Sequence, residues 1–380
     1  MSASPRIAVA CSGLGHIQRG IESWAADLTR ALRRAGADVT LFAGARAEGA
    51  VALPALRRTG AAATTLTGGL RHLGGWRYGM GSAYDVEQTS FAFHLWRHIR
   101  RRFDILHVQD PMIAIWLDRA HRAGLSRPKV IYANGTGEGA AVMRRFSFLQ
   151  VLTQTAADAW MPQKPADQMA FAIPNFIDTT RFQPGDRAGP RARFGLPPGQ
   201  TIILCCAAIR RFHKRIDSLI QAFAAVPSDA MLVIAGGREA DTDGLIAEGT
   251  AALGDRIRFL PDLPRDRMPD LYRAADAFVL PSLHEMFGIV LLEALATGLP
   301  VLCNDTPDFR AIVGRGGLYR DLGADGELAA GLTCLLDPAI RAPLAAAGRA
   351  HVEQHFAEAA VTGAVTAMYR TIQAAPSYVR

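Results

Sequence analysis

Residues 277–303 read Ala-Phe-Val-Leu-Pro-Ser-Leu-His-Glu-Met-Phe-Gly-Ile-Val-Leu-Leu-Glu-Ala-Leu-Ala-Thr-Gly-Leu-Pro-Val-Leu-Cys. The stretch begins with a short apolar run typical of a buried strand and continues through a turn into a helical segment that Gly298 and Pro300 close. A second apolar run follows at once. A strand, a helix and another strand in this order form the repeating unit of a parallel sheet, so the stretch predicts an α/β protein.

The same alternation of apolar runs and helical patterns continues on both sides of this stretch. The strand-like runs are 7–11, 39–42, 105–108, 130–133 and 149–152, then 202–207, 231–235, 257–260, 277–280 and 301–303. Between the two sets, residues 183–200 are rich in proline and glycine, which we interpret as a linker. At 380 residues the chain has room for two domains. We expect Rossmann-like domains at 1–180 and 181–355, and a closing helix within 356–380 that packs back on the first domain.

Composition narrows the class of protein. Hydrophobic residues make up 49% and charged residues 20%, as in globular domains, and no apolar run is long enough to span a bilayer. The five cysteines are odd in number and have no Cys-x-x-Cys spacing, which argues against a disulfide framework or a zinc site. The first residues lack the pattern of a signal peptide, so we expect a cytoplasmic protein.

Positive charge is concentrated in the first half. Residues 1–180 hold 21 Lys+Arg against 13 Asp+Glu, a net charge of +8, whereas residues 181–380 have a net charge of −1. This asymmetry favours an anionic partner for the first half, either a membrane surface or a phosphorylated substrate. The alternative is an arginine-rich composition, since the only lysines are Lys129, Lys164 and Lys214.

Two short motifs allow more than one interpretation. The loop with Gly13, Gly15 and Gly20 follows the first strand, but it lacks a third glycine at Gln18 and no acidic residue closes the second strand, which argues against a dinucleotide-binding oxidoreductase. The loop either holds an anion or turns tightly. Residues 241–243, Asp-Thr-Asp, imitate a metal clamp, but helix capping explains them better, so we expect no metal site.

Two segments of the first half stand out. Residues 65–93 form the least regular region, with glycines interleaved with aromatic residues, which is typical of a functional loop. In residues 94–103, Leu95, Trp96 and Ile99 lie among four arginines. This stretch is either an interfacial helix suited to anionic lipid or an ordinary surface helix with one buried side.

Glu285 and Glu293 stand with seven residues between them, set in Pro281-Ser282 and Phe287-Gly288 and followed by Ala294, Gly298 and Pro300-Val301. This pattern closely resembles the signature of family 4 retaining glycosyltransferases. Other segments match that family in order: Phe103-Asp104-Ile105-Leu106-His107; Pro174-Asn175-Phe176-Ile177-Asp178 with Arg181-Phe182 and Pro184; Lys214-Arg215-Ile216-Asp217 with Leu219-Ile220 and Ala222-Phe223; Leu271-Tyr272 with Ala274-Ala275-Asp276. The resemblance extends over nearly the whole chain.

The resemblance implies the GT-B fold, in which two Rossmann-like domains, an N-terminal acceptor domain and a C-terminal donor domain, face a central cleft. It implies transfer of a hexosyl group, with retention of configuration, from a nucleotide diphosphate sugar to an acceptor hydroxyl on a glycan, a glycolipid or a small molecule. No metal and no cofactor beyond this co-substrate is implied, and no nucleic acid partner. Together with the charge asymmetry, it leads us to expect an anionic or membrane-borne acceptor and a cytoplasmic protein, peripheral at the inner membrane face.

The resemblance also assigns roles to residues. Lys214, Arg210 and the helix start at Gly288 would neutralise the diphosphate, with Phe287, Ile289 and Val290 beside it. Glu293 would hold the ribose hydroxyls and Glu285 the sugar hydroxyls, while Gly20 would let its loop approach the diphosphate. For His107 two interpretations stay open, a catalytic sugar contact or a packed histidine at a strand end.

The chain departs from the family pattern at three positions. The arginine that the family places five residues before the lysine is Ile209 here, so Arg210 or Arg211 would have to substitute. Met286 replaces a glycine, and Gln109 stands where many members carry a second histidine. These departures concern the donor site more than the fold.

Lys214 also has an argument independent of the family. In a chain with three lysines, a lysine at the start of a helix is an unusual choice of surface cation and fits a compact point charge on phosphate. Two alternatives to a transferase stay open: a GT-B nucleotide-sugar epimerase and a non-catalytic nucleotide-sugar binding protein.

Overall fold

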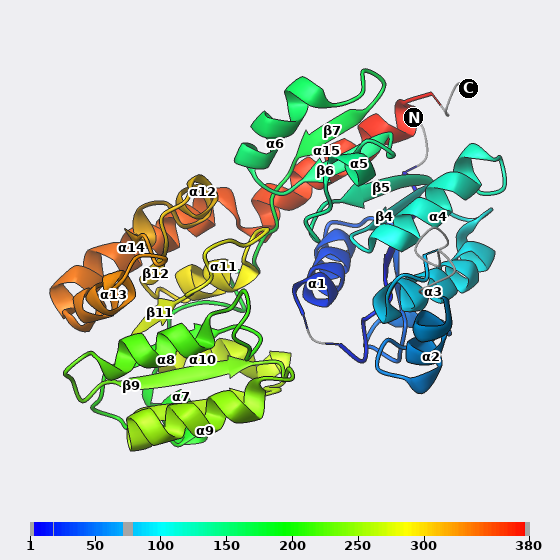
Figure 1. Ribbon diagram of the computed structural model, residues 1–380. Coiled ribbons are helices and arrows are strands. Elements are labelled where there is room, and N and C mark those ends of the chain that lie inside the picture. Colours follow the sequence, from blue (N-terminus) through cyan, green and yellow to red (C-terminus); the bar gives the residue numbers. More distant parts are fainter. Residues whose placement is uncertain (1–3, 18, 71–78, 377–380) are drawn as a thin grey trace. The chain divides into compact units, whose positions relative to one another are not determined.

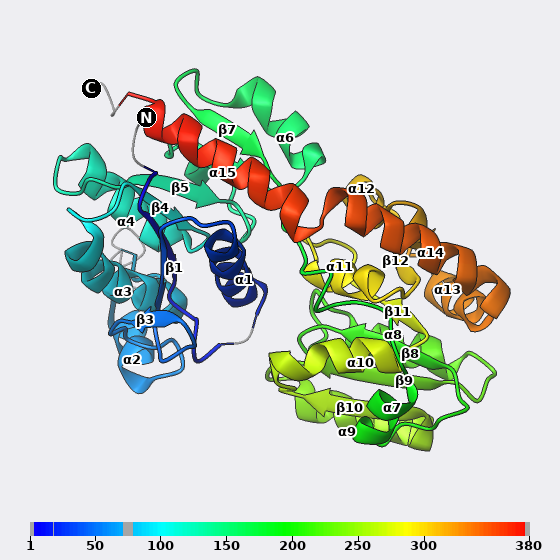
Figure 2. The ribbon, with the colours of Figure 1, turned by 180° about the vertical axis from the view of Figure 1, so that it is seen from behind.

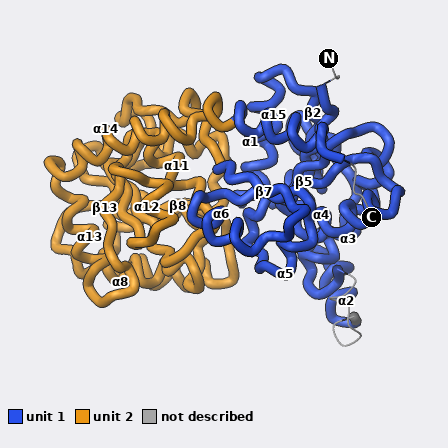
Figure 3. Tube along the Cα trace, turned by 90° about the horizontal axis from the view of Figure 1, so that it is seen from above, with its two compact units in different colours: residues 1–174, 362–380 blue, residues 175–361 orange. Residues whose placement is uncertain are grey.

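The computed structural model describes residues 4–17, 19–70 and 79–376. The chain forms two compact units, shown in Figure 3. Unit 1 consists of residues Met1–Pro174 and Thr362–Arg380, and unit 2 of Asn175–Val361. The chain therefore leaves the first unit, builds the second without interruption, and returns to the first.

Unit 1 contains a seven-stranded sheet with the order β3-β2-β1-β4-β5-β6-β7, and each described pairing is parallel. Its strands are β1 Ile7–Cys11, β2 Val39–Ala43, β3 Ala50–Ala52, β4 Ile105–Val108, β5 Lys129–Ala133, β6 Phe148–Val151 and β7 Met169–Ala172. Its helices are α1 Gly20–Arg34, α2 Ala61–Leu70, α3 Ala83–Ile99, α4 Pro111–Arg122, α5 Ala140–Met143, α6 Gln154–Trp160 and most of α15, Glu358–Ala374 (Figure 1).

Both faces of this sheet are covered, which explains why its central strands are apolar throughout. On one face, α3 and α4 pack side by side against residues such as Leu106 and Val130. On the other side of this sheet lies α15 (Figure 2). It reaches the sheet through Tyr369, whose hydroxyl lies 2.8 Å from Nδ1 of His107. The ammonium group of Lys129 contacts the carbonyl oxygens of Ile372 and Gln373 at 2.8 and 3.3 Å, so it complements the negative end of that helix.

Unit 2 contains a six-stranded sheet with the order β10-β9-β8-β11-β12-β13, again parallel. Its strands are β8 Ile202–Cys206, β9 Met231–Gly236, β10 Ile257–Pro261, β11 Ala277–Val279, β12 Val301–Asn304 and β13 Gly317–Arg320. Its helices are α7 Ala188–Phe194, α8 Ile216–Ala224, α9 Thr242–Leu253, α10 Met268–Ala274, α11 Ile289–Ala296, α12 Pro307–Val313, α13 Glu327–Leu336 and α14 Pro338–His355.

The predicted α/β class with doubly wound parallel sheets is confirmed. In each sheet the strand order reverses once, between β1 and β4 in unit 1 and between β8 and β11 in unit 2. At such a reversal the loops leaving the two strands turn to opposite faces, and open sheets bind ligands in the crevice outside the carboxyl ends of those strands. The fold therefore predicts two candidate ligand sites, one at the carboxyl ends of β1 and β4 and one at the carboxyl ends of β8 and β11.

The interpretation of residues 183–200 as a linker was wrong. They contain α7, which ends at Gly195 with φ of 62°, and they belong to unit 2. The guanidinium of Arg191 is buried and binds Asp276 at 2.6 Å and the carbonyl oxygens of Ala274 and Pro198, so the segment is fixed to the unit. Pro190 misled the sequence interpretation because proline is tolerated in the first turn of a helix.

Two expectations for unit 1 also need correction. Residues 65–93 are not one irregular loop, because α2 and α3 take up both ends; residues 71–78 of this segment lie outside the described residues. The interfacial helix proposed for 94–103 is the C-terminal part of α3, and its Leu95 and Ile99 have no exposed surface because they pack in the core. The ordinary helix with one buried side was the correct alternative.

Among the described residues, no single helix is long and apolar enough to cross a bilayer; α13 and α14, bent by 92° at the break between them, reach that length and composition only as a pair.

Candidate functional site

Lys214 and Glu285 form an ion pair at the carboxyl ends of β8 and β11 in unit 2. Lys214 belongs to the loop between β8 and α8, and Glu285 to the loop between β11 and α11. Both side chains are largely buried, with 18% and 12% of their surface exposed. The structure thus brings together two residues that are 71 positions apart in the sequence and that the family resemblance assigned to one site.

The backbone around Lys214 is strained. Among the described residues, only three other than glycine have positive φ, and two of them, His213 at 69° and Arg215 at 50°, flank Lys214. The guanidinium of Arg215 donates to the carbonyl oxygens of Leu322 at 2.6 Å and Pro281 at 3.3 Å, which holds the loop against the segment that carries Glu285. Strained conformations persist where surrounding contacts fix them, and they concentrate at functional sites.

The electrostatic field of this loop is positive. The pKa of His213 is lowered, first by burial and then by the charge of Lys214, with Arg210 acting in the same sense and Glu285 opposing it. His213 is therefore neutral near pH 7. Nε of Arg210 is buried and has no hydrogen-bond partner in the part of the chain that the structure describes. Ile209, in the position of the family's arginine, is fully buried, so the nearest candidate cation is Arg210.

Helix α11 follows β11 after a loop of nine residues and begins after Gly288, as predicted. Gly288 precedes it in the left-handed conformation, with φ of 75° and ψ of 63°, which glycine adopts without strain. The first amides of a helix have no acceptor within the helix and, with the helix dipole, attract anions. Gly288, Ile289 and Val290 are partly exposed, whereas the ring of Phe287 is 3% exposed and packs against Phe356. Phe287 therefore shapes the turn from the interior of the unit.

Glu293 lies inside α11 with 2% of its surface exposed. Its Oε2 accepts a hydrogen bond from the hydroxyl of Tyr272 at 2.8 Å, and its Oε1 one from Nη1 of Arg265 at 3.1 Å. Burial raises the pKa of Tyr272 strongly, so the hydroxyl stays a donor. These two donors fix the position of the carboxylate within α11.

Asp241 and Asp243 make contacts within the protein. Oδ2 of Asp241 accepts from the amide of Arg211 at 3.2 Å, and Asp243 pairs with Arg238 at 2.6 Å. The two aspartates thus hold loops at the start of α9. Asp241 is the N-cap residue of this helix, but its side chain does not form the capping hydrogen bond that we expected. Across the described residues, no three His, Cys, Asp or Glu side chains gather as they would around a metal ion.

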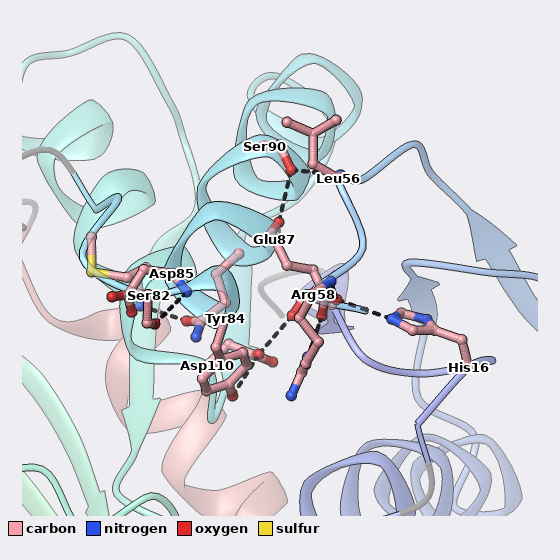
Figure 4. A network of polar contacts seen from close by, with 12 residues as sticks. His16, Leu56, Arg58, Ser82, Tyr84, Asp85, Glu87, Ser90 and Asp110 are labelled. Carbon is pink, nitrogen blue, oxygen red and sulfur yellow. Dashed lines mark hydrogen bonds and ion pairs between the residues drawn. The ribbon is translucent and has the colours of Figure 1, made fainter. Parts of the chain in front are cut away.

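A second polar cluster lies at the carboxyl ends of β1 and β4 in unit 1 (Figure 4). At its centre Glu87, fully buried, accepts from Nη2 and Nε of Arg58 at 2.6 and 3.0 Å and contacts Nε2 of His16 at 3.1 Å. Burial alone would raise the pKa of Glu87. Its hydrogen bonds with Arg58 and His16 lower the pKa by more than burial raises it, so the net pKa lies below the usual value and the carboxylate stays ionised.

Asp110 and Glu22 are the other two acids of this cluster. Oδ1 of Asp110 accepts from the hydroxyls of Ser12 at 2.9 Å and Tyr84 at 3.1 Å. The second carboxyl oxygen of Asp110 and Oε2 of Glu22 are buried without a hydrogen-bond partner among the described residues. Burial raises the pKa of both carboxyl groups, and the charge of Asp110 also raises that of Glu22.

Sequence reasoning missed this cluster. Its residues come from five separate segments, and no spacing along the chain connects them. The one available signal was position. Asp110 comes two residues after the end of β4, and Ser12 directly after β1, at the edge where parallel sheets bind ligands.

The remaining predicted residues lie in unit 1. His107 has no exposed surface; its ring is in edge contact with Trp24 and Tyr369, and burial lowers its pKa to about 3. In this conformation His107 is a packed histidine whose side chain has no surface open to a ligand. Gly20 is the first residue of α1, and a Cβ there would meet no atom within 4 Å, which leaves its backbone open to a ligand. Gln109 is 3% exposed, beside Gly135.

Comparison with known proteins identifies the class. Residues 18–181 match the sequence model described as Glycosyltransferase Family 4, and residues 187–337 match the one described as Glycosyl transferases group 1. Sucrose-phosphate synthase (tll1590) from Thermosynechococcus elongatus superposes with a TM-score of 0.77 at 20% identity, covering 98% of this chain and 100% of that one. Anabaena Alr3699/HepE in complex with UDP and glucose gives 0.74 at 16% identity, covering 97% and 100%. The chain therefore has the GT-B fold and belongs to the family 4 glycosyltransferases.

Among curated relatives, the D-inositol 3-phosphate glycosyltransferase of Nocardia farcinica (strain IFM 10152) is 40% identical over 144 residues, 35% of this chain and 32% of that protein. The protein of the same description from Acidothermus cellulolyticus (strain ATCC 43068 / DSM 8971 / 11B) is 32% identical over 212 residues, 52% and 47% of the two chains. The matched stretch thus spans between a third and a half of these relatives.

Proposed function

We propose that this chain is a retaining glycosyltransferase that moves a hexosyl group from a nucleotide diphosphate sugar to an acceptor hydroxyl. The observation that carries the proposal is the ion pair between Lys214 and Glu285, held on a strained loop beside Arg210 and next to the start of α11. UDP and UDP-glucose complexes of the structural neighbour Alr3699/HepE support a nucleotide-sugar donor.

Departure of a nucleoside diphosphate requires stabilisation of negative charge that grows in the transition state. Lys214, Arg210 and the first amides of α11 at Ile289 and Val290 supply fixed positive charge and dipoles for this purpose. Because these groups are set before the substrate arrives, little reorganisation is needed during the reaction. This chemistry needs no metal ion and no cofactor beyond the donor itself.

Glu285 and Glu293 have different surroundings and therefore different roles. Glu293 is held in a fixed orientation by Tyr272 and Arg265, and a carboxylate, which accepts but does not donate, suits the two ribose hydroxyls. Glu285 has Lys214 as its partner in the free protein. When a diphosphate takes over Lys214, the carboxylate of Glu285 is released to accept hydrogen bonds from the hydroxyls of the transferred sugar.

The acceptor is assigned to unit 1. Its polar cluster contains one oxygen each of Asp110 and Glu22 that is buried without a hydrogen-bond partner among the described residues. Tyr84 and His16 belong to the same cluster (Figure 4). Carboxyl oxygens and hydroxyls of this kind bind and orient a polyhydroxylated acceptor.

The proposal is tested by donor binding followed by transfer. Thermal unfolding is measured with UDP, GDP, ADP and their sugar conjugates, since a ligand that binds the native state raises the unfolding temperature. The donor that stabilises is then incubated with candidate acceptors, and the anomeric configuration of the product is read by NMR. An inverted product would contradict retention. Epimerisation of the donor, with no transfer to any acceptor, would favour the epimerase. Tight donor binding, with neither transfer nor release of free nucleotide diphosphate, would favour the non-catalytic binding protein.

A further inference from the structure

Four arginines gather around one surface pocket of unit 1. The pocket lies between the C-terminal half of α4 and the segment after α5, and its charged lining residues are Arg119, Arg122, Arg144, Arg145 and Asp118. Phe146 forms part of its buried floor. The lining therefore carries a formal charge of +3, a large imbalance for groups this close together.

Within the described residues, Arg122 is the only one of these four arginines whose guanidinium group donates hydrogen bonds to the protein. Arg122 donates from Nε to Asp118 at 2.8 Å and from Nη2 to the carbonyl oxygen of Arg145 at 2.6 Å, so it is part of the scaffold. Arg119, Arg144 and Arg145 are exposed and have no carboxylate partner within the described ranges. Arg119 and Arg144 lie near the rings of Trp116 and Trp160, at 5.2 and 6.0 Å, which limits their freedom.

The pocket lies at the amino edge of the sheet of unit 1. Helix α4 starts after the carboxyl end of β4 and runs back, so Arg119 and Arg122 are at its far end. Arg144 and Arg145 precede β6, which begins at Phe148. The polar cluster with Asp110 lies at the opposite edge. A ligand of the arginine pocket is thus separated from the place assigned to the acceptor by the length of the strands.

Two exposed apolar side chains are connected through Trp96 to the loop that follows the arginine-bearing end of α4. Leu125, three residues after Arg122, is 62% exposed, and its carbonyl oxygen accepts from Nε1 of Trp96 at 3.2 Å. Phe93, one turn before Trp96 on α3, is 56% exposed, and the two rings are 6.4 Å apart. Arginines beside protruding apolar residues fit the two layers of a bilayer surface, phosphate outside and hydrocarbon beneath.

We propose that the arginine pocket binds phosphate headgroups of an anionic lipid bilayer, with Leu125 and Phe93 entering the interfacial layer. This site is independent of the donor and acceptor sites. The pocket contains part of the excess positive charge of the first half of the sequence. It is a different place from residues 94–103, the stretch for which the sequence suggested lipid binding.

The test is co-flotation of the full chain with vesicles of phosphatidylcholine alone or with a third phosphatidylglycerol, at low and high salt. We expect binding to the anionic vesicles only, weakened by salt. Each basic residue near such a surface contributes about fivefold, so the triple variant Arg119→Gln, Arg144→Gln, Arg145→Gln is expected to bind about 100-fold more weakly. A matched control changes three exposed arginines elsewhere, Arg258→Gln, Arg315→Gln and Arg370→Gln, and is expected to bind as the unchanged protein does.

Leu125→Ala tests the apolar part separately and is expected to weaken binding several-fold with the same dependence on salt. Circular dichroism, thermal unfolding and donor binding check that all variants are folded, and donor binding is expected to be unchanged in each. Equal binding by the two triple variants would overturn the proposal, because net charge alone would then be responsible. A protein that does not bind anionic vesicles would overturn the proposal too. If such a protein bound glycerol phosphate at the pocket, the ligand would be a soluble phosphate and not a lipid bilayer.

Discussion

Glu285→Gln is expected to tighten the binding of a free nucleoside diphosphate while most turnover is lost. In the free protein the Glu285 carboxylate holds Lys214, so an incoming diphosphate must first displace it. The amide of glutamine keeps the size of the side chain but removes the negative charge, which leaves Lys214 available. Turnover falls because the carboxylate that would hold the sugar hydroxyls is gone.

The magnitude follows from the burial of the pair. Two unit charges about 4 Å apart interact with about 4 kcal/mol at an effective dielectric constant of about 20, and loss of hydration offsets much of this. Because each side chain is less than one-fifth exposed, we take the net value as about 1 to 2 kcal/mol, above the range of fully exposed pairs. The dissociation constant of the diphosphate is then expected to fall by about 5-fold to 30-fold.

Lys214→Met completes a double-mutant cycle. In the Glu285→Gln background this change removes a whole charge-assisted phosphate bond, about 1.5 to 3 kcal/mol, and is expected to weaken diphosphate binding by about 10-fold to 160-fold. In the native background the loss is smaller by the energy of the ion pair, since the diphosphate no longer competes with Glu285. Titration calorimetry of the four proteins with the diphosphate and with its sugar conjugate measures both effects. Additive changes, or weaker diphosphate binding by Glu285→Gln alone, would refute the displacement argument.

Three further expectations concern the donor carboxylate, acidity and metal. Glu293→Ala is expected to weaken donor binding by about 2 to 4 kcal/mol and also to lower the free energy of unfolding by about 1 to 3 kcal/mol, because the buried Tyr272 hydroxyl loses its acceptor; Tyr272→Phe, which keeps the carboxylate, serves as the control, and unchanged donor affinity in Glu293→Ala would exclude the ribose role. His107 has a folded pKa of about 3, so the unfolded chain binds the extra proton first and stability is lost as pH falls below about 6.5, by about 2 kcal/mol at pH 5; urea unfolding of His107→Gln at pH 7 and pH 5 should show a correspondingly smaller acid sensitivity. Transfer activity measured with and without a chelator is expected to be the same, and strict dependence on added manganese would contradict the metal-free mechanism.

The strands could be predicted from the sequence because a parallel sheet covered on both faces leaves continuous apolar runs. Residues 105–108, read as a strand, are β4 without any change of boundary. β3, β7 and β13 were missed. Their residues are intermediate or exposed in burial, as is usual at the edges of a sheet, where nothing requires an apolar run. β13 also begins with glycine, which normally indicates a turn.

The donor-side residues could be predicted only because they fall in two short segments that the family resemblance recognises. Lys214 and Glu285 meet through the folding of two loops, and no periodicity predicts that contact. Glu87 and Arg58 show the limit more clearly: one lies on α3 and the other before α2, and neither belongs to a motif. The role of Phe287 could not be read from the sequence either, since a ring that shapes a turn and one that touches a ligand occupy the same position in the motif.

The return of the chain to unit 1 has a consequence for its synthesis on the ribosome. Most proteins begin to fold from the N-terminus as they emerge, but unit 1 lacks its last helix until residues Thr362–Arg380 have been made. Until then the face of the sheet that receives Tyr369 is covered only in part, and His107 has Trp24 beside it but lacks Tyr369. Unit 2, continuous in sequence, is able to fold first although it is encoded second. A nascent chain halted before residue 362 would therefore hold a finished second unit and an open first one. New termini placed between Pro174 and Asn175 would make both units continuous in sequence, with unit 2 encoded first.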